Sequence, residues 1–174
     1  MKNNTKWLVT IFILAFVLSI VFSGISTIMS NSLPTFALVA IIILVIIIGI
    51  IFDMIGVAVL TSKEASLHAK ASKKLKGAKE AISLLKNSTK VASVCNDVIG
   101  DICGIVSGSL GAVLTIAIAS HFDFAAAATI ITVLITAIIS ALTVGFKAVF
   151  KSVATKNSDT IVFTVGKILS IFKK

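Results

Sequence analysis

Four long stretches of almost uninterrupted apolar residues dominate the chain. They cover residues 7–29, 36–60, 91–120 and 124–146. A helix needs roughly 20 apolar residues to cross the hydrocarbon core of a bilayer, so each stretch predicts a transmembrane helix. The first stretch also fits a secretory signal peptide, but its apolar run is longer than the usual signal core, and we interpret it as a span. The pattern predicts an all-α, polytopic helical membrane protein with four transmembrane helices in one membrane domain, residues 1–174.

Lysines mark one side of the predicted membrane. Two lysines precede the first span, eight lie between residues 63 and 90, and six lie from residue 147 onward. The connections 30–35 and 121–123 contain no lysine. Because lysine-rich connections stay in the cytoplasm, we predict a multi-pass protein of the cell membrane with both termini and the central connection cytoplasmic.

The lysine-rich central connection has an amphipathic pattern. Its apolar positions recur every three or four residues, at Leu67, Ala71, Leu75, Ala78, Ile82 and Leu85. The pattern predicts a cytoplasmic amphipathic helix over 62–86, with Thr61 and Glu64 as a capping box and Gly77 as a mild interior weakness or a hinge. A similar repeat predicts a C-terminal interfacial helix over 158–174. We expect these helices to lie on anionic lipids of the inner leaflet, although the first could instead be solvated and packed on its neighbour.

Composition favours the bilayer over other partners. Hydrophobic residues make up 57% of the chain, the mean hydropathy is +1.13, and 16 lysines face 7 acidic residues without any arginine or tyrosine. Nucleic-acid surfaces rely on arginine forks and stacked aromatic rings, so we predict no nucleic-acid partner. No nucleophile accompanies a base, and no phosphate-binding glycine loop is present, so we predict that the protein is not an enzyme.

Three aspartates fall inside the predicted spans, where a charged side chain costs about 2.5–3.5 kcal/mol. At about 1.5 Å per residue, Asp53 lies about 12 Å from the cytoplasmic end of its span, and Asp97 and Asp101 lie about 10 and 16 Å from theirs. All three therefore come to nearly one depth. Oxygen ligands favour a hard cation such as Mg²⁺ or Ca²⁺ over Zn²⁺ or Cu²⁺, so we predict a metal site for such an ion. Its predicted ligands are Asp53, Asn96, Asp97 and Asp101. Protonation, hydrogen bonding or an internal counter-charge from Lys147 are the alternatives.

Small residues accompany these aspartates. Gly56 follows Asp53 on the second span, and Gly100, Gly104 and Gly108 repeat every four residues on the third. Such a series lets another helix backbone come close. It predicts packing between the second and third spans, or self-association of the third span in a homodimer.

The order of segments between residues 52 and 151 has a counterpart in a known family. A span ends in FDMIGVAVLTS, a basic helix EASLHAKASKKLKGAKEAISLLKN follows, and the next span opens with NSTKVASVCNDVIGDI. This layout resembles the transmembrane domain of the CNNM/CorC family of magnesium transporters, with Asn96 and Asp97 at the place of that family's paired asparagines. The resemblance implies a homodimer that takes a dehydrated divalent cation from the cytoplasm. The chain departs from the family in lacking the late Glu and Pro of the last span, around 146–150, and the CBS pair after it.

Two functions remain as hypotheses. The first is a divalent-cation transporter, for Mg²⁺ above all, with the acidic site inside the membrane. The second is a non-transporting membrane protein that binds a lipid surface or a protein partner, in which Lys147 neutralises the acidic layer.

Overall fold

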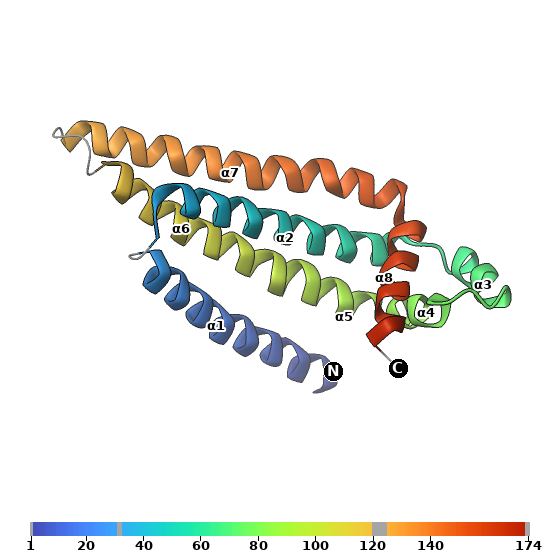
Figure 1. Cartoon of the computed structure of the whole chain (residues 1–174). Coiled ribbons are helices and arrows are strands. Elements are labelled where there is room, and N and C mark those ends of the chain that lie inside the picture. Colours follow the sequence, from blue (N-terminus) through green and yellow to red (C-terminus); the bar gives the residue numbers. More distant parts are fainter. Residues whose placement is uncertain (1, 31–32, 120–124, 173–174) are drawn as a thin grey trace. The chain divides into compact units, whose positions relative to one another are not determined.

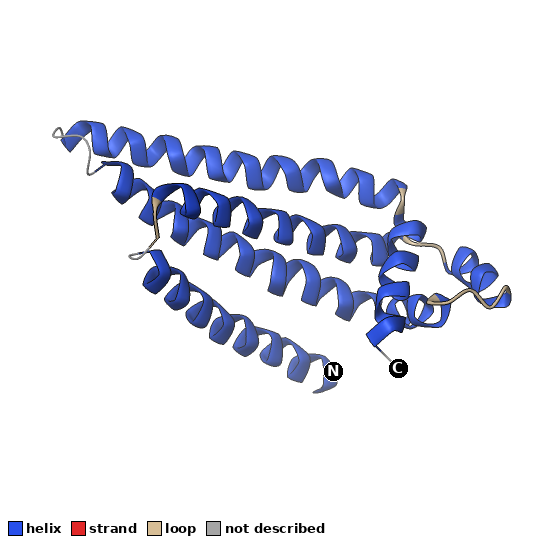
Figure 2. Ribbon diagram, in the orientation of Figure 1, coloured by secondary structure: helices blue, strands red, loops and turns tan. Residues whose placement is uncertain are grey.

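The computed structural model describes residues 2–30, 33–119 and 125–172, and this part of the chain is almost entirely helical, with no β-strand (Figures 1 and 2). In chain order the helices are α1 (Lys2–Ser30), α2 (Thr35–Thr61), α3 (Glu64–Ser72), α4 (Ala78–Lys86), α5 (Ser88–Ser93), the π-helix η1 (Val94–Gly100), α6 (Asp101–Ala119), α7 (Ala125–Lys156) and α8 (Ser158–Phe172). The predicted all-α class is confirmed. The predicted span ends at residues 120 and 124 lie outside the described residues.

Three segments in the described part of the chain are long and apolar enough to cross a membrane. They are Thr35–Thr61, Ser88–Ala119 and Thr129–Lys156. This agrees with the predicted helical membrane protein at the level of helix length and composition. The first predicted span contains a shorter apolar helix, Val9–Gly24, so the fourth membrane crossing stays a prediction.

The chain divides into two compact units, and each is described by itself. The first comprises Met1–Gly49 and Val98–Phe146. In this unit α1 packs against α6. Buried side chains recur every three or four residues along α2 and α6, as packed helix faces require; they are Leu38, Ile42, Ile46, Ile102, Val106, Leu110 and Leu114. Most large apolar side chains described on α1 and α7 are exposed, as expected for helix surfaces that face lipid.

The second unit comprises Ile50–Asp97 and Lys147–Lys174. Its apolar core draws on the ends of α2 and α7 and on α3, α4 and α8, through Ala58, Val59, Leu67, Ala81, Leu85, Ala154 and Val162. Helix α8 packs against α4 and, less extensively, against α3. The basic connection is therefore part of a packed helical unit rather than an isolated surface helix.

The predicted single helix over 62–86 is wrong, because a turn separates α3 from α4. In this turn Lys74 and Gly77 have left-handed φ values of 54° and 91°. The backbone of Gly77 also crosses α8 so closely that a Cβ atom on Gly77 would lie 2.5 Å from the Cα atom of Lys167. Both the conformation and the contact exclude a side chain. The close packing of this segment on α8 thus accounts for the turn between α3 and α4, where the sequence pattern predicted a continuous helix.

The predicted capping box at the start of the same helix is also wrong. Lys63 is the N-cap residue of α3 and makes no side-chain capping bond. Instead the Asp159 Oδ1 atom of α8 accepts hydrogen bonds from the Lys63 backbone N–H, at 2.9 Å, and from the Ser62 hydroxyl, at 2.7 Å. A carboxylate 96 residues away in the chain therefore takes the role expected of a local cap.

Candidate functional site

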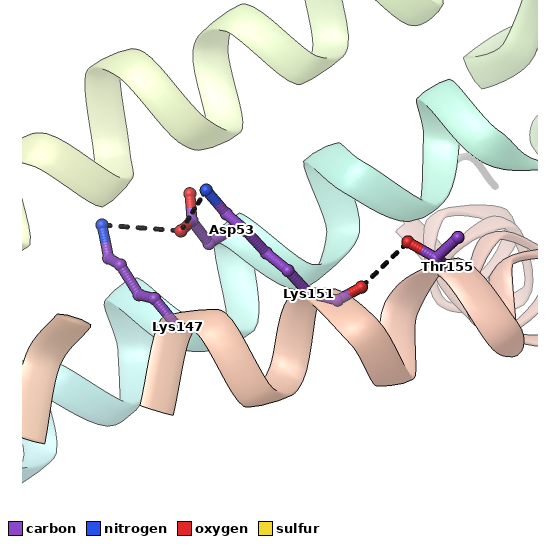
Figure 3. A network of polar contacts seen from close by, with 4 residues as sticks. All are labelled: Asp53, Lys147, Lys151 and Thr155. Carbon is purple, nitrogen blue, oxygen red and sulfur yellow. Dashed lines mark hydrogen bonds and ion pairs between the residues drawn. The ribbon is translucent and has the colours of Figure 1, made fainter. Parts of the chain in front are cut away.

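A buried aspartate of α2 lies within ion-pair distance of two lysines of α7. Asp53 is 4% exposed, and its Oδ2 atom lies 3.6 Å from the Lys147 Nζ atom and 3.7 Å from the Lys151 Nζ atom (Figure 3). The two lysines are four residues apart on one helix, so they share a face. Figure 3 shows both side chains extending from α7 toward the carboxylate. The structure thus places the predicted counter-charge, Lys147, beside Asp53 and adds Lys151, which sequence reasoning missed.

Two ammonium groups approach one oxygen of the Asp53 carboxylate. At an effective dielectric constant of about 20, the attraction between Asp53 and Lys147 is about 4–5 kcal/mol, before the desolvation of both groups is subtracted. The Lys147 side chain is 19% exposed and the Lys151 side chain 51% exposed. Lys147 is therefore the inner partner of Asp53, and Lys151 is the outer one.

Gly56 lies almost one helical turn after Asp53 and faces Asn96 of η1. A Cβ atom on Gly56 would overlap the Asn96 side-chain oxygen, so the missing side chain lets the amide approach the backbone of α2. Within the described residues, the Asp53 Oδ2 and Asn96 Oδ1 atoms are both buried and neither accepts a hydrogen bond. Buried polar atoms are normally hydrogen-bonded, so two such oxygens in one unit need an explanation.

The helix that carries Asn96 widens into the π-helix η1 over Val94–Gly100. A π-helix uses i→i+5 hydrogen bonds, usually lasts a single turn, and often lies at a functional site. Sequence reasoning predicted a regular helix here, because apolar periodicity carries no signal for a π-turn. The only sequence feature that marks the position of this π-helix is the polar pair Asn96 and Asp97 inside an apolar span.

Asp97 and Asp101 are exposed, unlike Asp53. The Asp97 Oδ2 atom accepts a hydrogen bond of 2.8 Å from the Ser93 hydroxyl, which lies four residues earlier. Asp101 begins α6 and belongs to the first unit. Within residues 2–30, 33–119 and 125–172, no group of three or more His, Cys, Asp or Glu side chains could hold a metal ion. The magnesium site therefore stays a prediction.

The glycines predicted to pack helices fall into two kinds. Gly56 is buried and in close contact with Asn96. Cβ atoms on Gly104 and Gly108 would meet nothing within 4 Å, so this part of the α6 surface is open. These two glycines help to line a cavity of about 170 Å³, together with hydroxyl side chains such as Ser107, Thr136 and Ser140. Self-association of α6 through this open face stays a prediction.

A second polar cluster joins α8 to α3. Lys70 of α3 donates a 3.4 Å hydrogen bond to the Asp159 backbone carbonyl, and its Nζ atom lies 4.6 Å from the centre of the Phe163 ring. Burial alone would raise the pKa of Asp159, but hydrogen bonds from Ser62, Lys63 and Ser66, together with the charge of Lys70, outweigh it and lower the pKa. The ionised carboxylate is therefore the form that holds these two helices together.

Comparison of the chain with models of protein families, with curated proteins and with solved structures finds no match. The resemblance to the CNNM/CorC family accordingly stays a prediction that rests on the residues quoted for it.

Proposed function

We propose that the chain is an integral membrane protein that transports no ion and binds the anionic inner leaflet through the basic helices of its second unit. In this proposal α1 is the fourth span, and both termini with α3, α4 and α8 are cytoplasmic. The lysine distribution supports this orientation. Helix α1 has 29 residues, or about 43 Å at the rise of an α-helix, which is enough to cross a bilayer.

An exposed apolar edge flanked by lysines carries this proposal. Leu75, in the turn between α3 and α4, is 45% exposed, and Phe172, at the end of α8, is 82% exposed. The turn and α8 meet where Gly77 contacts Lys167, so the two segments are neighbours. We define the lysine-flanked edge as the exposed apolar residues Leu75, Ile168, Ile171 and Phe172 together with the exposed lysines Lys73, Lys74, Lys76, Lys79 and Lys167.

This edge has the chemistry of the boundary between lipid headgroups and acyl chains. An apolar side chain gains about 0.8 kcal/mol for each CH₂ group that leaves water. Each lysine near an anionic leaflet adds about 1 kcal/mol. Four apolar residues and five lysines in neighbouring segments therefore favour a negatively charged lipid surface over plain solvent.

The Asp53 cluster favours this function over cation transport. Its carboxylate already has two ammonium partners. These ammonium groups repel an incoming cation at short range, where the local dielectric is low.

Depth-dependent quenching tests the proposal on the full chain in lipid nanodiscs. An environment-sensitive fluorophore on Phe172→Cys, with Cys95 and Cys103 replaced by alanine, should be quenched by acyl-chain spin labels in bilayers that contain anionic lipid. The matched control is Ser83→Cys, at an exposed polar position of α4, which should stay unquenched. Equal quenching at the two positions, or none at Phe172→Cys, contradicts the proposal.

A divalent-cation transporter that works as a homodimer is the second candidate. The buried oxygens of Asp53 and Asn96 without hydrogen-bond donors favour it, because carboxylate and amide oxygens are the ligands that a hard cation such as Mg²⁺ prefers. Binding of the ion would then require the Lys147 and Lys151 side chains to move away from the Asp53 carboxylate. The test is thermal stabilisation of the full chain by Mg²⁺, Ca²⁺ or Mn²⁺. A shift that disappears in Asp53→Asn and Asn96→Ala supports this candidate, and no shift in the parent chain refutes it.

A further inference from the structure

An apolar cavity of about 310 Å³ lies among α1, α2 and α6 in the first unit. Every side chain that lines it is apolar or, in the case of one cysteine, only weakly polar. All three helices contribute to the lining, through residues such as Leu18, Phe22, Val45, Ile48, Cys103 and Val106. An engineered apolar cavity of about 150 Å³ stays dry and binds benzene, so this cavity has room for an apolar group of about 12 carbon atoms. It offers no charged group or hydroxyl to an ion, a water molecule or a lipid headgroup.

The helices around the cavity are packed against one another. Helix α1 packs along α6. A Cβ atom on Gly49 of α2 would lie 2.9 Å from the Cys103 Cβ atom of α6, so these two helices come close beside the cavity. Protein interiors contain few voids larger than a water molecule, because side chains around a void lose contacts with neighbouring atoms. A space of this size between packed helices therefore needs an occupant.

Two observations indicate which occupant fits. Phe22 and Ile48, which line the cavity, are 44% and 37% exposed, so the cavity opens onto the apolar outer surface of the unit. Ile48 is the central residue of the candidate span Thr35–Thr61, and Cys103 lies at the middle of the candidate span Ser88–Ala119. In a membrane-spanning orientation the cavity is therefore near the middle of the hydrocarbon core, where it is surrounded by lipid acyl chains.

We propose that this cavity binds one acyl chain of a membrane lipid, close to the methyl end of the chain. The chain enters from the side, past Phe22 and Ile48. Apolar surface is already out of water inside a bilayer, so the gain comes from van der Waals contacts with the lining side chains. The site requires only that the spans cross the bilayer and shares no residue with the lysine-flanked edge, so the two proposals can fail separately.

Photo-cross-linking of the full chain in nanodiscs tests the cavity. The discs consist of phosphatidylcholine, and a small fraction of this lipid has a diazirine near the methyl end of one acyl chain. Mass spectrometry locates the cross-linked residues. Cross-links at Leu18, Phe22 and Ile48 should be several-fold more frequent than at Ile138 and Leu142, which are exposed apolar residues near the middle of the candidate span of α7. The same lipid with its diazirine beside the ester group should not show this preference.

Variants that fill the cavity provide the matched comparison. Val45→Phe should lose most of the preferential cross-linking, and Val106→Phe, which fills the cavity from α6, should do the same. Val133→Phe adds the same group at an exposed position of α7 and should keep the preference. Equal cross-linking of the cavity and of α7 in the parent would overturn the proposal without any variant. A preference that persists in both filling variants, with melting temperatures like the parent's, would overturn it as well. Cross-links on α7 alone would overturn it in favour of a second copy of the chain as the occupant.

Discussion

Substitution of Gly56 by alanine is the sharpest probe of the contact between α2 and η1. The added methyl group would overlap the Asn96 side-chain oxygen, so the amide or the backbone has to move. A second variant, Gly145→Ala on α7, serves as the matched control, because a Cβ atom there meets nothing within 4 Å. Both substitutions introduce the same methyl group at a helical glycine.

Two opposing effects set the expected size. Alanine is favoured over glycine inside a helix by roughly 0.5–1 kcal/mol, and this gain applies to both variants. Insertion of a methyl group into a filled space costs about 1–3 kcal/mol, and this cost applies only to Gly56→Ala. The net expectation is a loss of about 1–2 kcal/mol for Gly56→Ala and a gain of up to about 1 kcal/mol for Gly145→Ala. At about 2–4 °C per kcal/mol, the two variants should melt several degrees apart.

The assay is a double-mutant cycle on the full chain in detergent, read as melting temperature. Asn96→Ala removes the amide that the new methyl group would strike. Gly56→Ala should therefore cost much less in the Asn96→Ala background, with a coupling energy of about 1 kcal/mol or more. Additive effects of the two substitutions would refute the contact.

Three further predictions address topology, association and pH. A cysteine at Ser32 should react with an impermeant maleimide in intact cells and one at Ser72 should not, when both are introduced without the native cysteines; the opposite pattern would refute the orientation. Gly104→Leu should shift the protein toward the monomer in a size measurement, and an unchanged distribution would rule out association through the open face of α6. The lowered pKa of Asp159 adds stability above its unfolded pKa of about 4, and this stability disappears as the pH falls through the folded value. Asp159→Asn should therefore melt lower than the parent at pH 6, and the gap should narrow as the pH falls below about 4; a gap that stays constant in acid would contradict the capping role.

The long helices could be predicted from sequence because their cause is local. Continuous apolar runs of more than 20 residues leave the backbone few alternatives, and the helices α2 and α7 include the predicted stretches as far as the structure describes them. The pairing of Asp53 with a lysine was also accessible, since a charge inside a span demands a partner. Lys151 was missed although it stands four residues after Lys147, a spacing that places both on one face.

The features that sequence reasoning missed depend on distant parts of the chain. A single glycine such as Gly77 costs a helix only about 1 kcal/mol, so nothing local requires the turn between α3 and α4. The turn follows from the close approach of Gly166, whose added Cβ atom would lie 2.5 Å from the Gly77 carbonyl oxygen. The cap supplied by Asp159 likewise exists only once α8 has packed. Amphipathic patterns identified the apolar faces of these helices but not the helices against which those faces pack.

The second lysine bears most directly on function. An aspartate inside a span is expensive, and one lysine is enough to neutralise it, so Lys147 alone accounts for the burial of Asp53. Lys151 adds repulsion toward Lys147 and little further shielding, because half of its side chain remains exposed. Two ammonium groups at one carboxylate oxygen repel a further cation, so the second lysine supports the proposed lipid-binding function over cation transport.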